Sequence, residues 1–179
     1  TALLEAFLLS MEMDLKKHNY DLKTYQTYIY GSAEVVGLMC LHIFCEGNAS
    51  AFEKLKPAAK HLGAAFQKVN FLRDIKADFE GLGRMYFPNC DFSKFTQSDK
   101  AVIEADIQAD FEEALKGIKQ LPLKARFGVY VAFKYYYSLF KKIKKTHHEE
   151  ILKERIRIPT PGKLFIVAKA TLRSQLNLL

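Results

Sequence analysis

The stretch AFQKVNFLRDIKADFEGLGRMYFP, residues 65–88, decides how this chain folds. Four polar residues in it are spaced by three, four and four positions, so they share one narrow stripe of a helix that turns by about 100° per residue. They are Gln67, Asn70, Asp74 and Asp78. Mostly apolar residues fill the rest of the circumference. A mostly apolar helix with one polar stripe is usually buried, and we expect this stripe to face a cavity.

The two carboxylates of the stripe indicate a metal site. Asp74 and Asp78 lie one helical turn apart, and such a pair is mutually repulsive, with roughly 5–6 Å between its Cβ atoms, unless a cation lies between them. Oxygen ligands of this kind suit a hard cation such as Mg2+. A D-x-x-x-D pair alone on a helix is common and usually binds no metal. Asn70 one turn upstream and Arg73 beside Asp74 strengthen the prediction of a magnesium site.

Composition bounds the class of protein. At 179 residues, with 49% apolar and 13% aromatic residues, the chain suits one globular domain over residues 1–179. The first residues lack the basic leader of a secretory signal. The longest uncharged apolar run, Val35 to Cys45, is shorter than the roughly 20 residues of a membrane span. Cys40, Cys45 and Cys90 fit no zinc or redox spacing. We therefore expect a cytoplasmic protein with reduced thiols.

The net charge of +7 is concentrated near the C-terminal end. Residues 134–173 contain eleven Lys or Arg and three Glu, whereas the remainder is nearly neutral. A basic end of this kind can contact nucleic acid, an anionic membrane or an anionic substrate, or can simply be a solvated surface. Because the magnesium motif favours phosphates on a substrate, we expect no nucleic-acid partner, and we treat peripheral membrane contact as a hypothesis.

Apolar residues recur at three and four positions almost throughout, which predicts an all-α protein of six or seven helices. The expected helical segments are 1–17, 22–44, 49–56, 57–79, 98–119, 125–145, 149–155 (a turn or short helix) and 160–178. Pro57 is expected to begin the central helix, because proline is tolerated in a first turn. Ser98 is expected to cap the helix that follows the loop, because serine accepts well at an N-cap.

Two motifs resemble those of the squalene/phytoene synthase family. The string N-x-x-R-D-x-x-x-D at residues 70–78, followed by R-x-Y-x-P at residues 84–88, resembles the second aspartate-rich motif of that family. The stretch YIYGSAEVVGLM, residues 28–39, resembles the signature Y-x-Y-x-x-A-x-x-V-G, except that Glu34 replaces a residue that is often small. The resemblance covers essentially the whole chain.

This resemblance implies an isoprenoid-synthase helical bundle that joins two isoprenoid diphosphates head to head. It implies metal ligation of Mg2+ by Asn70, Asp74 and Asp78, and diphosphate binding by Gln67, Arg73, Arg84 and Arg155. It places Ala33, Val36 and Gly37 at the substrate pocket, and a catalytic Tyr136 near the diphosphate. Tyr28 and Tyr86 are the catalytic candidates near the reacting carbons. Aromatic faces can stabilise a carbocation there by about 0.5–2 kcal/mol each. Core tyrosines with satisfied hydroxyl groups are the equally weighted alternative.

Three functions follow as alternatives. The first is a prenyltransferase that condenses two geranylgeranyl diphosphates to phytoene in carotenoid biosynthesis. The second is squalene or dehydrosqualene synthesis from farnesyl diphosphate. The third is a non-catalytic assembly factor of the same fold, in which eroded aspartates would be expected, whereas Asn70, Asp74 and Asp78 are intact.

One departure from the family pattern bears on activity. The family has additional N-terminal helices with a first D-x-x-x-D motif, and Glu12-Met13-Asp14 has the wrong spacing to replace it. We expect the chain to be the C-terminal portion of a longer enzyme, with the N-terminal helices of the bundle missing. By itself it should not condense its substrates, and the face left uncovered should promote self-association.

Overall fold

The structure, a computed structural model, describes residues 2–15 and 20–175, which contain helices and no strands. This part of the chain forms α1 (Ala2–Met13), α2 (Leu22–Ile29), α3 (Val35–Phe44), α4 (Ala49–Leu82), α5 (Gln97–Ile118), α6 (Leu123–Lys145), α7 (His148–Ile151) and α8 (Thr160–Gln175). A π-helical segment, η1 (Tyr30–Glu34), joins α2 to α3, and a short 3-10 helix, η2 (Phe92–Lys94), precedes α5. The all-α prediction is confirmed.

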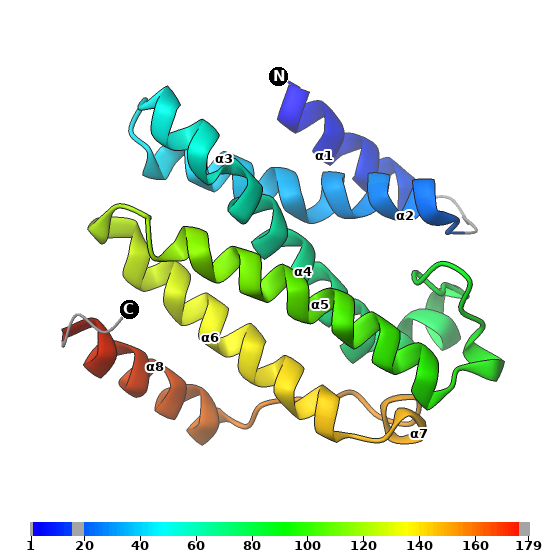
Figure 1. Ribbon diagram of the computed structural model, residues 1–179. Helices are drawn as coiled ribbons and strands as arrows, with labels where there is room; N and C mark the ends of the chain where they lie inside the picture. Colours follow the sequence, from blue (N-terminus) through cyan, green and yellow to red (C-terminus); the bar gives the residue numbers. More distant parts are fainter. Residues whose placement is uncertain (1, 16–19, 176–179) are drawn as a thin grey trace.

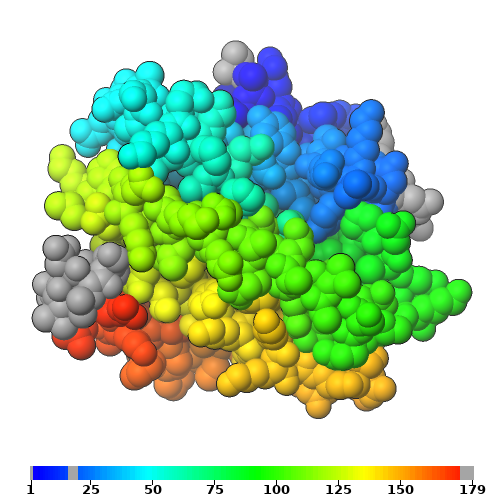
Figure 2. All heavy atoms as spheres, viewed as in Figure 1, coloured from blue at the N-terminus to red at the C-terminus, as the bar shows by residue number. Residues whose placement is uncertain are grey.

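Three long helices, α4, α5 and α6, pack against one another, as Figure 1 shows. The N-terminal helices α1 to α3 contact α4 or each other on one side, and α8 packs along α6 on the other. In the space-filling view, α5 lies across the molecule between these two groups (Figure 2). The core lies between the long helices, where Val69, Ile107 and Phe140 have no solvent-exposed surface.

Residues 22–44 form one continuous helical stretch, as expected, but with the π-helical segment η1 in its middle. Its small residues permit very close crossings. A Cβ added at Gly31 would lie 2.4 Å from the carbonyl oxygen of Ala6 on α1, and one added at Gly37 would lie 2.8 Å from that of Ala59 on α4. Leu22–Phe44 is long and apolar enough to cross a membrane, by length and composition alone. In this fold it is packed between α1 and α4.

The expected helix boundary at Pro57 is wrong, because α4 runs through Pro57 without a break for 34 residues. Asn48 caps its start by accepting a hydrogen bond from the backbone N–H of Ala51. A proline inside a helix removes one backbone hydrogen bond, but the residues around Pro57 are held by packing. Leu55 is buried, and a Cβ added at Gly117 of α5 would meet the Cβ of Ala58 at 2.2 Å.

The predicted cap of α5 is also wrong, because Thr96 rather than Ser98 caps the helix. Thr96 and Asp99 form a reciprocal capping box, in which each side chain accepts the other residue's backbone N–H. Together Thr96 and Asp99 satisfy two backbone N–H groups at the start of the helix, and Ser98 satisfies neither of them.

Other helix ends differ slightly from expectation. The first helix ends at Met13 instead of near residue 17, α6 begins at Leu123, and α7 covers only His148–Ile151. Residues 16–19 and the expected end of the last helix at residue 178 lie outside the described part of the chain.

One face of α1 is apolar and uncovered. Leu4, Leu8 and Met11 share this face, and they are 55%, 63% and 37% exposed. Their spacing of four and three residues is that of a single helical stripe.

Candidate functional site

The four stripe residues of α4 are all partly buried, as the sequence pattern predicts. Because the helix is unbroken from residue 49 to 82, Gln67, Asn70, Asp74 and Asp78 remain in register along one face. Gly63, one turn before Gln67, has no side chain to block the crossing helix. A Cβ added there would lie 2.6 Å from the carbonyl oxygen of Ala33.

Asp74 is held by two arginines. Arg73 donates from Nε and Nη2 to its two carboxylate oxygens at 3.0 and 2.5 Å. Arg155, in the connection between α7 and α8, binds the same oxygens from Nε at 2.6 Å and from Nη2 at 3.2 Å. Bidentate pairs of this kind are strong and geometrically specific. The structure therefore brings together three of the predicted site residues at one carboxylate.

Asp78 and Asn70 offer oxygen atoms beside this cluster. Burial, and then the negative charge of Asp74, raise the pKa of the Asp78 carboxyl from 3.8 to about 6, although Arg84, Arg73 and Arg155 act in the opposite direction. The Oδ1 atom of Asn70 is buried and has no hydrogen-bond partner in the described part of the protein. Buried polar atoms are nearly always hydrogen-bonded, so an unsatisfied one suggests a missing ligand.

A separate cluster around Arg84 lies on one flank of the stripe. Arg84, in the loop after α4, donates to Asp14 Oδ1 at 3.1 Å and to the Asp14 main-chain oxygen at 2.5 Å. The Tyr28 hydroxyl donates to the same Asp14 Oδ1 at 2.9 Å. The rings of Tyr28 and Tyr86 stack with their centroids 5.4 Å apart, and Tyr86 stacks on Phe71 of α4 at 4.1 Å. Burial is the main cause of the raised pKa values of both tyrosine hydroxyls.

Tyr136 lies on the other flank. Its ring stacks on Phe66 of α4 with 3.9 Å between centroids and 15° between ring planes. The three predicted catalytic tyrosines therefore divide into a pair, Tyr28 and Tyr86, and a separate ring on the opposite side of the stripe.

An apolar cavity of about 330 Å³ adjoins the stripe. Helices α3, α4, α5 and α6 and the segment η1 line it, and every residue predicted for the substrate pocket is among its walls. Gln67 belongs both to the stripe and to the cavity wall, so the polar face leads directly into apolar space. The predicted pocket residues that line it are Ala33, Val36 and Gly37.

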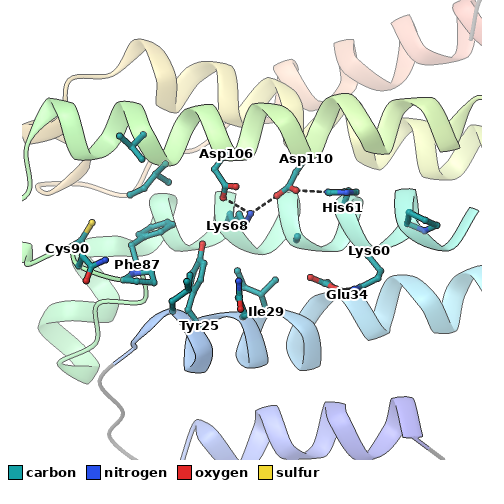
Figure 3. Close-up of a pocket in the computed structure, with 18 of the residues that line it drawn as sticks. Tyr25, Ile29, Glu34, Lys60, His61, Lys68, Phe87, Cys90, Asp106 and Asp110 are labelled. Carbon is teal, nitrogen blue, oxygen red and sulfur yellow. Dashed lines mark hydrogen bonds and ion pairs between the residues drawn. The ribbon is translucent and has the colours of Figure 1, made fainter.

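A larger hollow lies on the opposite face of α4, between α2 and α5 (Figure 3). Its volume is about 990 Å³. At its floor Lys68 donates to Asp106 at 2.5 Å and to Asp110 at 2.7 Å, and His61 Nδ1 lies 2.7 Å from Asp110 Oδ1. None of the predicted site residues lines it. Because Lys68 and both carboxylates are bound to one another, this network ties α4 to α5.

The sequence motifs did not single out Asp14, which contacts two of the predicted site residues. Asp14 accepts hydrogen bonds from two predicted residues, Arg84 and Tyr28, although its spacing from Glu12 excluded it as a metal motif. No local pattern marks it, because its ion-pair partner is 70 residues away in the chain. The adjacent histidines His147 and His148, with Glu149, form the one group of three or more His, Cys, Asp or Glu in the described residues whose ligand atoms lie within 4.8 Å of one another. Two of the three are exposed at the start of α7.

Comparisons with known proteins point in one direction. The sequence model of the Squalene/phytoene synthase family matches residues 1–161. A 15-cis-phytoene synthase of Synechocystis sp. is 28% identical over 187 residues, covering 91% of this chain and 55% of that protein. Phytoene synthase 3 of Zea mays is 29% identical, covering 92% of this chain and 42% of that protein. The chain therefore spans about half the length of these relatives.

Among solved structures, a dehydrosqualene synthase crystallised with a ligand superposes on 99% of this chain and 66% of its own, with a TM-score of 0.70 and 18% identity. At this identity the likeness shows the fold alone.

Proposed function

The chain belongs to the squalene/phytoene synthase family, and from this membership we propose that it carries the second aspartate-rich face of a head-to-head prenyltransferase site. The proposed reaction condenses two geranylgeranyl diphosphates to phytoene in carotenoid biosynthesis. The observation that carries the proposal is made at Gln67. There the polar stripe of α4, with the arginines bound beside it, meets the apolar cavity. A diphosphate head and a prenyl tail need these two surfaces next to each other.

The arginines provide the phosphate contacts. Arg73, Arg84 and Arg155 each bind a carboxylate in this structure, Asp74 or Asp14. An incoming diphosphate can take over some of these charge-assisted hydrogen bonds, because guanidinium groups bind phosphate and carboxylate oxygens in the same bidentate manner. The diphosphate is a better leaving group once its negative charge is balanced in this way.

The residues present fit a divalent cation. Asn70, Asp74 and Asp78 offer amide and carboxylate oxygens on one helix face, and the unsatisfied Oδ1 of Asn70 is the atom expected to gain a partner. Mg2+ bound by these residues would neutralise diphosphate oxygens and act as a Lewis acid. Arg73 and Arg155 would then share Asp74 with the cation or release it to bind phosphate.

The apolar cavity and the tyrosines serve the hydrocarbon part of the substrate. Val36, Gly37 and Phe66 line walls that exclude water from a prenyl tail. The rings of Tyr28, Tyr86 and Tyr136 lie on both flanks of the stripe, where aromatic faces can stabilise a positively charged carbon. The tyrosine hydroxyls are not available as acids near neutral pH where burial raises their pKa values.

The proposal is tested with the purified chain, Mg2+ and labelled geranylgeranyl or farnesyl diphosphate in separate reactions. Magnesium-dependent binding of geranylgeranyl diphosphate is expected. Condensation is assayed with the chain alone and with the N-terminal portion of the Synechocystis relative added as a separate polypeptide, and we expect phytoene only in the second case. Preferred binding and coupling of farnesyl diphosphate would instead support squalene or dehydrosqualene synthesis. Absence of any magnesium-dependent diphosphate binding would favour a non-catalytic role.

Self-association stays a prediction. The exposed stripe of Leu4, Leu8 and Met11 on α1 is the face that would mediate it, and analytical ultracentrifugation of wild type and Leu8→Glu would detect it.

A further inference from the structure

Asp14 joins three separate parts of the protein through one side chain and one carbonyl group. It directly follows α1, and its backbone N–H donates to the carbonyl oxygen of Met11 at 3.1 Å, which places it at the end of that helix. From there its Oδ1 accepts hydrogen bonds from Tyr28 of α2 and from Arg84 in the loop after α4. Its main-chain oxygen accepts a second bond from Arg84.

These contacts determine where the Arg84 guanidinium lies. Arg84 is only 9% exposed, and its two terminal nitrogens donate to Asp14, with a longer contact of 3.4 Å from Nη1 to the Tyr86 hydroxyl. The Nε–H group is buried and has no hydrogen-bond partner in the described part of the protein. Asp14 therefore binds the two terminal nitrogens of the guanidinium group, and the Nε–H group is left without a partner.

The same contacts determine the charge of the site. Arg84 opposes the rise in the pKa of Asp78, so its positive charge acts at the end of the polar stripe. Asp14 is the carboxylate that forms an ion pair with Arg84. A buried arginine that is paired on one edge attracts anions less strongly than an unpaired one, but it keeps a defined orientation.

We propose that Asp14 is a positioning residue of the diphosphate site, which fixes the guanidinium of Arg84 and balances its charge; this inference rests on the proposed function. Asp14 acts through Arg84 and does not itself contact the phosphate. Its role differs from that of the stripe carboxylates, because it orients a cationic side chain and contributes no cation-binding oxygen.

The first test is the affinity for inorganic pyrophosphate in the presence of Mg2+, measured by isothermal titration calorimetry. Asp14→Asn keeps acceptor oxygens for Tyr28 and Arg84 but removes the negative charge. We expect pyrophosphate to bind about three- to tenfold more tightly and with a steeper salt dependence, because the charge of Arg84 is no longer balanced. Glu5→Gln, which makes the same change of net charge at an exposed position of α1, should leave the affinity unchanged.

A double-mutant cycle separates positioning through Arg84 from general effects. In the Arg84→Gln background, Asp14→Asn should change pyrophosphate affinity by less than about twofold, because the residue through which it acts is gone. An unchanged affinity in the single variant, or an equal gain in both backgrounds, would overturn the proposal. So would weaker binding accompanied by a lower melting temperature, which is the result expected of a purely structural residue.

A second readout does not depend on ligand binding. In protein labelled with 15N-arginine, a buried Nε–H such as that of Arg84 should give a protected NMR signal, assigned by its loss in Arg84→Gln. Asp14→Ala should shift this signal and speed its exchange with solvent, whereas Glu5→Gln should not. An unperturbed signal would show that Asp14 does not fix Arg84. Failure of the wild type to bind pyrophosphate would instead refute the proposed diphosphate site, and with it this role of Asp14.

Discussion

Arg155 binds Asp74 across 81 residues of sequence, with Nε 2.6 Å from Oδ1 and Nη2 3.2 Å from Oδ2. This pair fastens the connection between α7 and α8 to the middle of the polar stripe on α4. Arg155 is half exposed whereas Asp74 is largely buried, so the arginine can leave the carboxylate for a phosphate without a large rearrangement of the core.

Replacing Arg155 by Gln should weaken binding of pyrophosphate with Mg2+ by about tenfold, because one bidentate phosphate donor is lost. Calorimetric titration at two salt concentrations measures this loss, and the salt dependence should become shallower. The matched control is Arg157→Gln, an exposed arginine two residues further along. Equal losses in the two variants would show that only the net charge of the basic end matters.

Replacing Asp74 by Asn should lower magnesium-dependent diphosphate binding by at least about a hundredfold, because the central carboxylate of the stripe is removed. Loss of the repulsion between Asp74 and Asp78 would by itself raise the melting temperature of this variant. The pairs with Arg73 and Arg155 reverse that expectation, and we expect a decrease of about 2 °C. Wild-type affinity at ordinary magnesium concentrations would refute the metal-site assignment, and circular dichroism checks the fold.

The raised pKa of Asp78, about 6, predicts two pH dependences of opposite sign. Without metal, the folded protein holds this proton more tightly than the unfolded chain, so the group's contribution to the free energy of unfolding is complete below about pH 4 and is lost as pH rises through about 6. Urea denaturation at several pH values in this range gives the free energy of unfolding of wild type and of Asp78→Asn as a function of pH. The difference between the slopes of these two curves is the contribution of Asp78.

Magnesium binding should show the reverse trend, because the cation competes with the same proton. The affinity should rise about tenfold between pH 5 and pH 7 if one carboxyl group dominates. A flat profile would mean that Asp78 is not a ligand.

Narrowing the apolar cavity should separate tail binding from head binding. Val36→Phe adds volume at the cavity wall and should weaken geranylgeranyl diphosphate binding by about tenfold or more while leaving pyrophosphate binding unchanged. Val102→Phe is the control, because Val102 is 69% exposed and lines the hollow on the opposite face of α4. Parallel loss of both ligands in Val36→Phe would show that the cavity does not hold the tail.

The basic C-terminal helices should attach weakly to anionic membranes. On α8, Leu164 and Phe165 are about two-thirds exposed beside Lys163 and Lys169, and basic residues near an anionic surface contribute about 1 kcal/mol each. Co-sedimentation with vesicles containing phosphatidylserine should decrease with salt and in Phe165→Ser. Sedimentation that responds to neither lipid charge nor salt would contradict this prediction.

Much of the fold followed from periodicity and much of the stripe from spacing, because both are local. Gln67, Asn70, Asp74 and Asp78 share a face simply because α4 is a helix. Arg73 and Arg155 meet at Asp74 only through the path of the chain after α6, which no local pattern encodes. The expected role of Arg73, Arg84 and Arg155 in phosphate binding stays a prediction, and their carboxylate partners were not foreseen.

The failures also have physical causes. Local rules for proline predicted a boundary at Pro57, but packing of Leu55 and Ala58 holds the helix together. The N-cap preference of serine predicts Ser98 as the cap of α5, whereas Thr96 has an acidic partner three residues later. The π-helical segment η1 was not predicted, because its sequence, YGSAE, carries no signal that distinguishes it from an ordinary helix.

That segment sets the rotational phase of the residues on either side of it. A π-helical turn holds one more residue than an α-helical turn, so the helix from Leu22 to Phe44 changes phase between Tyr28 and Val36. If the same residues formed a regular α-helix with none removed, everything beyond residue 34 would turn by about 100° relative to α2. Val36 and Gly37 would then leave the cavity wall while Tyr28 stayed beside Asp14. The extra residue of the π-helical turn therefore keeps Tyr28 beside Asp14 and Val36 in the cavity wall along a single helical stretch.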